Sequence, residues 1–258
     1  MARWSATTMV LSGYRWPVSL AALALLGAST GRAASQYRPA MPNGCPADGK
    51  WAREGDWAWE CRYRADNERL IAAKTKIDVV FMGDSITEGW AIADPSFFGP
   101  GRVDRGISGQ TSPQILDRFT PDVLRLHPRV VHVIAGTNDI AGNTGAMTLE
   151  WTENVIRNMA EHARAAGIRV VIGSVLPARV FGWKKEKRPA VAIATLNRWL
   201  HDYADRRGFT YADYYTAMAE SDGGMPARLS RDGVHPNKAG YAIMRPIAEA
   251  AIAKALAR

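Results

Sequence analysis

The sequence predicts an α/β protein built on a parallel β-sheet that is covered by helices on both faces. Short apolar runs rich in β-branched residues recur along the chain, at 77–83, 129–136 and 169–176. Runs of this kind, without polar alternation, are typical of strands buried on both faces inside parallel sheets. Segments with helical spacing of apolar residues lie between them. This alternation of strands and helices favours crossover connections and a single sheet.

The first expected strand, at 77–83, ends abruptly in a polar turn. Asp84 and Ser85 follow it directly, so Ser85 is expected at the carboxyl end of the strand. Ligands bind at that edge in open α/β sheets, because loop side chains and backbone N–H groups gather there. Ser85 and Glu88 also match a capping box, which leaves open the interpretation that the hydroxyl only caps the next helix.

The second and third strands place two more residues at the same edge. A short strand at 102–105 leads into a loop that contains Gly109, and the strand at 129–136 stops just before Asn138. Between them a helix is expected over 113–124, because its first residue is a proline and proline loses no hydrogen bond at that position.

The second half of the chain continues the alternation. A long helix is expected first, capped by Thr148, with Trp151 on its apolar face and Gly167 at its end. It is followed by a strand at 169–176 and a helix at 190–207 that ends at Gly208. A strand at 209–215 and an alanine-rich final helix complete the chain. Pro246 lies inside the final helix and predicts a kink or a division there.

The composition predicts one exported domain. The chain has 258 residues and is 47% hydrophobic, which suits a single sizeable core. Arg3 and Arg15, with no acidic residue, precede the apolar run 18–28, which is shorter than the roughly 20 residues of a membrane span. Residues 1–33 are therefore predicted to be a cleavable secretory signal, cut after Ala33, that directs a mature protein without an integral membrane span to the periplasm or the exterior.

The net charge bears on which partners the protein binds, and the cysteines bear on the redox state of its compartment. Removal of residues 1–33 lowers the formal net charge from +8 to +5, which is too small and too dispersed to predict nucleic-acid binding. Cys45 and Cys61 are the two cysteines, and an oxidising compartment favours a disulfide between them, worth roughly 3 kcal/mol by loop entropy. Two buried free thiols are the alternative.

An N-terminal extension over 34–75 is rich in turn residues and tryptophans. Trp57 and Cys61 are four residues apart and are expected to share a helix face. Packing of the tryptophans on the flank of the domain is predicted, with a platform for sugar rings as the alternative.

Five residues together match the needs of acyl transfer, which requires a nucleophile, a base, a group that orients the base, and donors to the oxyanion. Ser85 is the candidate nucleophile, and its N–H is also a candidate oxyanion donor. His235 is the candidate base, because imidazole accepts and returns a proton near neutral pH, and Asp232 is the candidate that orients it. Gly109, through its N–H, and Asn138, through its side-chain amide, complete the oxyanion donors.

Other interpretations of these residues stay open. Asp232 and Gly233 form an ordinary turn dipeptide, His235 is placed where it can cap the last helix, and Gly109 and Asn138 can each serve a turn or a cap. Asp232 and His235 also have metal-ligand spacing, but no second cluster supports a metal, so neither a metal nor an organic cofactor is expected. Asp84 and Asp139 are expected to accept local backbone donors. The other histidines are expected to be structural or solvated: His127, His132, His162 and His201.

Four blocks in order resemble the SGNH (GDSL-type) hydrolases, over about residues 77 to 256. They are Gly83-Asp84-Ser85, Gly109 within Ile-Ser-Gly-Gln-Thr, Gly136-Thr-Asn138-Asp139 and Asp232-Gly-Val-His235-Pro236. Ile86 stands where the family name has leucine, a conservative difference. The resemblance implies a flavodoxin-like three-layer α/β/α catalytic domain at 76–258. It also implies a serine esterase with Ser85 as nucleophile, Gly109 and Asn138 as oxyanion donors, and Asp232 with His235 as the rest of the triad.

The predicted function is that of a secreted serine esterase, but the substrate is open. The family includes carbohydrate deacetylases, lysophospholipases, thioesterases and arylesterases, and the fold selects none of them. Export, together with aromatic residues expected to be exposed in the loops at 94–101 and 177–188, favours O-acetyl groups on a carbohydrate. The alternative of another class is a noncatalytic carbohydrate-binding protein. The sequence does not predict an oligomeric state.

Overall fold

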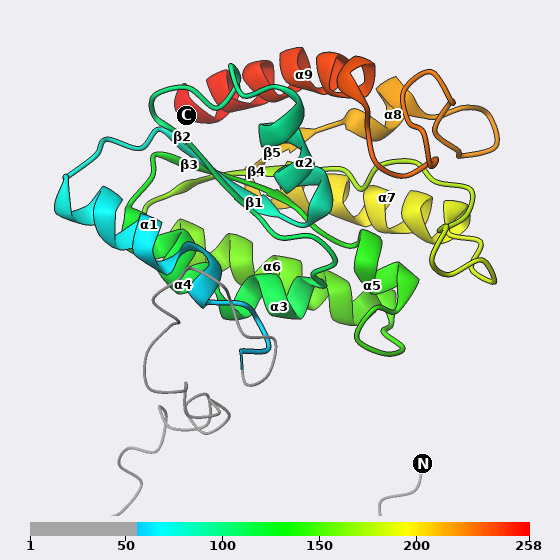
Figure 1. Cartoon of the computed structure of the whole chain (residues 1–258), viewed down its shortest axis with the longest axis horizontal. Helices are drawn as coiled ribbons and strands as arrows, with labels where there is room; N and C mark the ends of the chain where they lie inside the picture. Colours follow the sequence, from blue (N-terminus) through cyan, green and yellow to red (C-terminus); the bar gives the residue numbers. More distant parts are fainter. Residues whose placement is uncertain (1–55) are drawn as a thin grey trace, which may run out of the picture. The chain divides into compact units, whose positions relative to one another are not determined.

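The computed structural model describes residues 56–258, and these contain one five-stranded parallel sheet in the order β2-β1-β3-β4-β5 (Figure 1). The strands are β1 (Val79–Gly83), β2 (Arg102–Gly106), β3 (Val130–Ile134), β4 (Arg169–Gly173) and β5 (Thr210–Ala212). This order is that of flavodoxin-like, doubly wound sheets, in which the chain starts in the interior and extends to both edges. The predicted three-layer α/β/α fold is confirmed.

Helices cover both faces of the sheet. On one face lie α2 (Ser85–Ala93), α8 (Tyr214–Met218) and α9 (Lys238–Leu256). On the other face lie α3 (Ser112–Asp117), α4 (Phe119–Asp122), α6 (Leu149–Ala165) and α7 (Ala190–Arg207). The remaining helices are α1 (Cys61–Ala72), which packs against α4, the short α5 (Thr137–Ala141) and the 3-10 helix η1 (Leu124–Leu126). Figure 1 shows α9 on one side of the strands and α3, α4 and α6 on the other.

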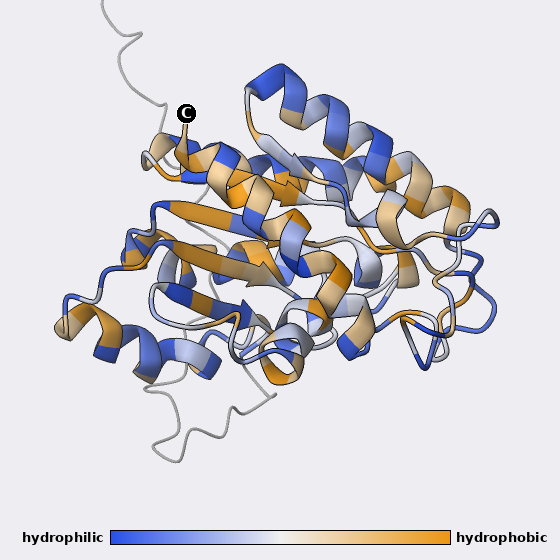
Figure 2. Cartoon of the chain, turned by 90° about the horizontal axis from the view of Figure 1, so that it is seen from above, coloured by the Kyte–Doolittle hydropathy of each residue, from blue (hydrophilic) through white to orange (hydrophobic). Residues whose placement is uncertain are grey.

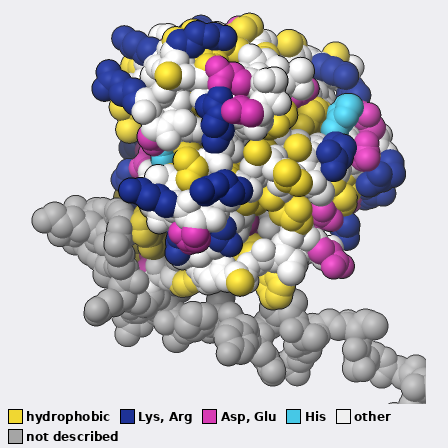
Figure 3. Space-filling model, turned by 90° about the vertical axis from the view of Figure 1, so that its right-hand side faces the viewer, with side chains coloured by type: hydrophobic (Ala, Val, Ile, Leu, Met, Phe, Trp, Pro, Cys, Tyr) yellow, Lys and Arg dark blue, Asp and Glu magenta, His cyan; other side chains and the backbone are white. Residues whose placement is uncertain are grey.

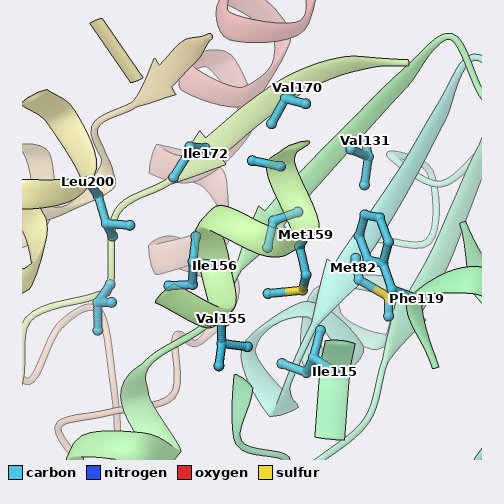
Figure 4. Packing of buried hydrophobic residues seen from close by; sticks show 14 of the residues in the cluster. Met82, Ile115, Phe119, Val131, Val155, Ile156, Met159, Val170, Ile172 and Leu200 are labelled. Carbon is cyan, nitrogen blue, oxygen red and sulfur yellow. The ribbon is translucent and has the colours of Figure 1, made fainter. Parts of the chain in front are cut away.

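The alternation of side chains along each strand divides the core in two. Val80 and Met82 of β1 join the cluster under α3, α4, α6 and α7, whereas Val79 and Phe81 join the cluster under α2 and α9. Since successive side chains of a strand point to opposite faces, one apolar strand supplies both cores. Figure 4 shows Met82 of β1 close to Ile115 and Phe119 of α3 and α4. Coloured by hydropathy, the central strands are mostly hydrophobic and the outer faces of the helices hydrophilic (Figure 2).

A buried histidine lies in the middle of the sheet. His132 of β3 is fully buried, and its Nε2 lies 2.7 Å from the hydroxyl of Tyr214. Burial lowers the pKa of His132 from its ordinary 6.5 to about 3, because the charged imidazolium would lose its hydration. The sequence-based expectation that this histidine is structural agrees with these contacts.

We expect His132 to make the protein less stable in mild acid. Below pH 6.5 the unfolded chain binds a proton at this histidine and the folded chain does not until about pH 3, so the free energy of unfolding falls as the pH drops. Between pH 8 and pH 5 this linkage lowers the free energy of unfolding by roughly 2 kcal/mol. Urea unfolding of the wild type and of His132→Phe at both pH values measures it. The loss between pH 8 and pH 5 should be about 2 kcal/mol smaller in the variant, and equal losses would contradict the linkage.

The expected helix at 113–124 is divided into α3, α4 and η1, so that prediction is wrong in its extent. Pro121 is the physical reason. It has no N–H to donate to the carbonyl of Asp117, and its ring crowds that carbonyl, which is where α3 ends. The division that was one of the two outcomes expected at Pro246 does not occur. Here α9 runs through the proline as one helix, because residues before and after it, such as Met244 and Ala248, pack into the same core.

Three smaller expectations also change. The strand expected at 209–215 is only Thr210–Ala212, since Asp213 caps α8 by accepting from the N–H of Thr216. The long helix α6 begins at the cap Thr148 as predicted, but Trp151 is 61% exposed and does not belong to its buried face. Trp57 precedes α1, so it does not share a helix face with Cys61.

Several predictions fall outside the described residues. The secretory signal at 1–33, the resulting export, and Cys45 of the expected disulfide lie there, and they stay predictions. Cys61 is the first residue of α1. Within residues 56–258 no helix combines the length and apolar character needed to cross a membrane.

Candidate active site

The predicted site residues come from loops and helix starts at the carboxyl ends of the strands. In Figure 1 the strands run towards the right, so α5 and the loop before α7 lie on that side. Figure 3 views this face directly, with hydrophobic side chains near its middle and Lys and Arg side chains around them.

Ser85 is the first residue of α2, directly after β1. The N-cap of the helix is Asp84, whose carboxylate accepts a hydrogen bond of 2.9 Å from the N–H of Ile86. The Ser85 hydroxyl therefore does not cap the helix, and its Oγ lies 2.9 Å from Nε2 of His235. Glu88 of the apparent capping box instead accepts from the N–H of Ser108, at 2.9 Å, on the neighbouring loop.

A glycine is required just before this turn. A Cβ at Gly83 would stand 2.7 Å from the carbonyl oxygen of Ile134 and would overlap the side chain of Thr87. The absence of a side chain lets the first turn of α2 lie against the ends of β1 and β3. This contact fixes where the helix starts, and with it the position of Ser85.

His235 and Asp232 lie on the loop that leads to α9. The Nδ1 atom of His235 is 2.6 Å from Oδ2 of Asp232, while Oδ1 of Asp232 accepts from the backbone N–H groups of Val234 and His235, at 3.0 and 2.8 Å. Because a carboxylate only accepts, Nδ1 carries the ring proton in the neutral imidazole, and the lone pair of Nε2 faces Ser85.

The same contacts keep Asp232 ionised. Partial burial opposes ionisation, but hydrogen bonds from the ring and the backbone of His235 and from Val234 outweigh it and lower the pKa of Asp232 well below its ordinary value. The loop thus presents a negative charge behind the imidazole that stabilises its protonated form.

Gly109 and Asn138 lie on the two adjacent loops. Gly109 has a φ of +82°, which favours glycine, and a Cβ there would meet no atom within 4 Å, so the requirement is conformational rather than steric. Asn138 is buried, and its Nδ2 donates to the carbonyl of Gln110 at 2.9 Å and to the carboxylate of Asp84 at 3.2 Å. The longer of these bonds is the one that would yield if the amide turned a hydrogen to an oxyanion.

Two buried aspartates support the site differently. Burial raises the pKa of Asp84 to about 6, although the hydrogen bond from the N–H of Ile86 and the nearby His235 both act to lower that pKa. Asp139 accepts from the N–H of Ser112 at 2.9 Å and from the hydroxyl of Thr152 at 3.3 Å, so it joins α5 to α3 and α6. The prediction of local backbone donors is confirmed for Asp84. Asp139 also accepts from backbone N–H groups, its own and that of Ser112, and the second of these is distant in the chain.

The loop between β4 and α7 adds residues that sequence reasoning did not assign. The Trp183 ring lies 5.9 Å from the His235 ring and stacks on Phe181, and its Nε1 donates to Asn143 at 3.0 Å. Trp183 is 42% exposed, but Phe181 is buried. Aromatic residues in a long basic loop were a visible signal for Trp183, whereas a lone asparagine gave none for Asn143.

The expected exposure of the other aromatic loop is wrong. Phe97 in the 94–101 loop is buried and stacks on Trp90, with ring centroids 4.7 Å apart, and Phe98 packs against the same core. The apolar rings fold back because they complete the core beneath α2. Of these two loops, the one before α7 brings an exposed aromatic ring beside His235.

A second aromatic feature lies away from these residues. Trp57 and Trp151 line a surface hollow of about 590 Å³ with Pro113, Leu116 and Val155. Ser85 and His235 do not line it. Among residues 56–258, no group of three or more His, Cys, Asp or Glu side chains is arranged to hold a metal ion.

The comparisons with known proteins concern the family and the fold of the chain. The model of the GDSL-like Lipase/Acylhydrolase family matches residues 81–243, and no curated protein matches the chain. A Bacteroides fragilis protein proposed to be an acylhydrolase is 43% identical, with a TM-score of 0.75, over 79% of this chain and 100% of that one. A GDSL-like lipase from Bacteroides thetaiotaomicron is 41% identical, with a TM-score of 0.73, over 77% of this chain and 99% of that one. An acetylxylan esterase from Geobacillus stearothermophilus shares the fold at 19% identity and a TM-score of 0.57, over 69% of this chain and 94% of that one.

Proposed function

This chain belongs to the GDSL-like lipase/acylhydrolase family, the SGNH hydrolases, and from that premise we propose that it removes O-acetyl groups from a carbohydrate through an acyl-enzyme on Ser85. The proposal has two parts, the roles of the site residues and the identity of the substrate. The contacts of Ser85, His235 and Asp232 support the first part, and the exposure of the site supports the second.

Acylation begins with attack of the Ser85 Oγ on the ester carbonyl carbon. His235 Nε2, 2.9 Å away, takes the hydroxyl proton as the C–O bond forms. The N–H groups of Ser85 and Gly109 and the amide of Asn138 donate to the oxyanion. When the tetrahedral intermediate collapses, the bond to the alcohol breaks, and His235 returns the proton to the leaving oxygen.

Deacylation repeats these steps with water as the nucleophile. His235 takes a proton from the water, whose oxygen attacks the acyl carbon, and the proton then passes to the Ser85 Oγ as the acid leaves. Asp232 stays ionised throughout and holds the imidazole in the required tautomer. The products are one carboxylic acid and one alcohol.

The observation that carries the choice of substrate is the exposure of the site beside an aromatic ring. The side chains of His235 and Asp232 are 38% and 50% exposed, and Trp183, next to His235, is 42% exposed. The bulk of a polymeric alcohol can therefore remain in solvent while one of its esters reaches Ser85. The indole face beside the proton donor is suited to pack on the apolar face of a sugar ring.

A panel of esters under identical conditions tests the substrate. We expect release of acetate from acetylated oligosaccharides at a kcat/KM at least about tenfold above release of fatty acid from lysophosphatidylcholine, a difference of roughly 1.4 kcal/mol in barrier. p-Nitrophenyl acetate serves as the small reference ester and p-nitrophenyl decanoate as its long-chain match. Preference for the decanoate and for lysophosphatidylcholine would overturn the carbohydrate proposal.

Variants of Trp183 test the role of its ring. Trp183→Ala should raise KM for an acetylated oligosaccharide by about two- to tenfold, the usual worth of one aromatic packing contact, whereas Trp183→Phe should keep KM close to the wild type. Methyl acetate, which has no ring to stack, is the control substrate. An equal rise of KM for methyl acetate would mean that the ring does not bind the alcohol group.

A further inference from the structure

We propose that Asn143 and Trp183 form a hydrogen-bond relay that sets the orientation of the Asn138 amide, and so keeps an N–H donor directed at the oxyanion. The proposal rests on the oxyanion role given to Asn138 above. It assigns Asn143, which sequence reasoning did not single out, as a positioning residue that acts through Asn138.

The direction of the relay follows from the chemistry of its ends. The indole Nε1 of Trp183 only donates, so the atom of Asn143 that lies 3.0 Å from it is the carbonyl Oδ1. The amide nitrogen of Asn143 then faces the other way. It donates to Oδ1 of Asn138 at 2.8 Å and to the carbonyl oxygen of Gly109 at 3.2 Å.

Asn138 is oriented from both sides as a result. Its Oδ1 accepts from Asn143, and its Nδ2 donates to two acceptors, the carbonyl of Gln110 at 2.9 Å and the carboxylate of Asp84 at 3.2 Å. The hydrogen on the longer bond, to Asp84, is the one that turns to the oxyanion. An amide turned by 180° would place two acceptors together at the Gln110 end and two donors together at the Asn143 end. It would also present its oxygen, instead of an N–H, to the oxyanion. The polarity of Asn138 therefore depends on a donor supplied by Asn143.

Asn143 also holds the second oxyanion loop. The peptide carbonyl of Gly109 accepts from Asn143 on one side of the loop, while the N–H of Gly109 is the donor proposed for the oxyanion. One side chain thus contacts two of the three residues that are proposed to bind the developing charge. Because Asn143 and Trp183 are both exposed, these bonds compete with water, and a partial rather than complete loss is expected without them.

Kinetics of a double-mutant cycle test the relay. Asn143→Ala should lower kcat for p-nitrophenyl acetate by about tenfold with KM changed less than about twofold, because only the transition state carries the oxyanion. Asn143→Asp should lower kcat further, since a carboxylate cannot donate to Asn138 and adds negative charge near the oxyanion. Asn154→Ala is the matched control, because Asn154 is also an exposed asparagine but lies on α6. Its kcat and KM should equal those of the wild type.

The background variant Asn138→Ala separates the possible failures. In that background Asn143→Ala should lower kcat by less than about threefold, because the group that it orients is gone. Undiminished kcat in Asn138→Ala itself would refute the proposed oxyanion donor. A loss in Asn138→Ala followed by a further full tenfold loss on adding Asn143→Ala would overturn the relay alone.

Trp183→Phe tests the start of the relay. It keeps an aromatic ring beside His235 and removes the N–H, so we expect a two- to threefold drop in kcat that is absent when Asn143 is already alanine. The free energy of unfolding of every variant, measured in urea, should lie within about 1 kcal/mol of the wild-type value, which would show that folding is intact. A drop in kcat of equal size in both backgrounds would refute the part assigned to Trp183.

Discussion

Ser85→Ala is expected to abolish ester hydrolysis, with kcat/KM lowered on the order of 10⁴- to 10⁶-fold. The variant removes the oxygen that is proposed to form the acyl bond, while the proposed oxyanion donors and the binding surface remain. Hydrolysis of p-nitrophenyl acetate measures the rate, and labelling by a serine-directed fluorophosphonate measures the nucleophile directly. The wild type should be labelled and Ser85→Ala should not.

The controls for Ser85 use a second serine and the base. Ser96 lies in the 94–101 loop, where its hydroxyl donates a hydrogen bond to the carboxylate of Asp94. Ser96→Ala should keep wild-type activity and labelling. The double variant Ser85→Ala, His235→Ala should hydrolyse the ester within a few fold of the rate of either single variant, because the two residues act as a unit. Retention of more than about one per cent of activity in folded Ser85→Ala would rule out the proposed nucleophile.

The second large effect concerns stability and a buried arginine beneath the nucleophile. The side chains of Arg118 and Asp122 are almost completely buried and form an ion pair of 2.8 Å. Arg118 also donates to the carbonyl of Gly83 at 2.9 Å and to the side chain of Gln110 at 2.6 Å, next to the turn of Ser85 and the loop of Gly109. Sequence reasoning did not assign this arginine, because an isolated basic residue normally predicts a solvated surface.

Arg118→Met is expected to lower the free energy of unfolding by roughly 3–5 kcal/mol, because it leaves the carboxylate of Asp122 buried without its cation. The melting temperature should fall by about 10 °C in a domain of this size. Urea and thermal unfolding of the wild type and the variant measure both quantities. Arg118→Met with Asp122→Leu should recover part of the loss, since the isolated buried charge is then removed.

A surface ion pair supplies the matched control. Arg129 and Asp78 are 62% and 54% exposed and lie 3.2 Å apart, so Arg129→Met should cost less than about 1 kcal/mol. Equal effects of Arg118→Met and Arg129→Met would mean that burial does not determine the contribution of the pair.

The differences between the predicted and observed elements lie at element boundaries. Periodicity located the buried strands because a strand covered on both faces must be apolar along its whole length, as in β1 and β3. Boundaries next to prolines were less reliable. Pro121 divides a predicted helix and Pro246 does not, and the difference comes from packing on either side of α9, which no local pattern contains.

Exposure was the hardest property to predict. Phe97 and Trp183 occur in similar loops, yet one completes the core and the other lies beside His235. A sequence shows that an aromatic residue is present in a loop, but the direction in which that loop folds depends on which apolar surface is left uncovered by distant helices.

Patterns that are local in the chain were sufficient to predict the fold class, the order of the loops and the family, because these depend on apolar periodicity and on short blocks of residues. The hydrogen-bond contact between Ser85 and His235, which are 150 residues apart, became visible in the folded structure. The folded structure also joins Trp183, Asn143 and Asn138 by hydrogen bonds. Hydrogen bonds between loops depend on distances of a few tenths of an ångström and on which group donates, and those are set by the packing of the whole sheet and its helices.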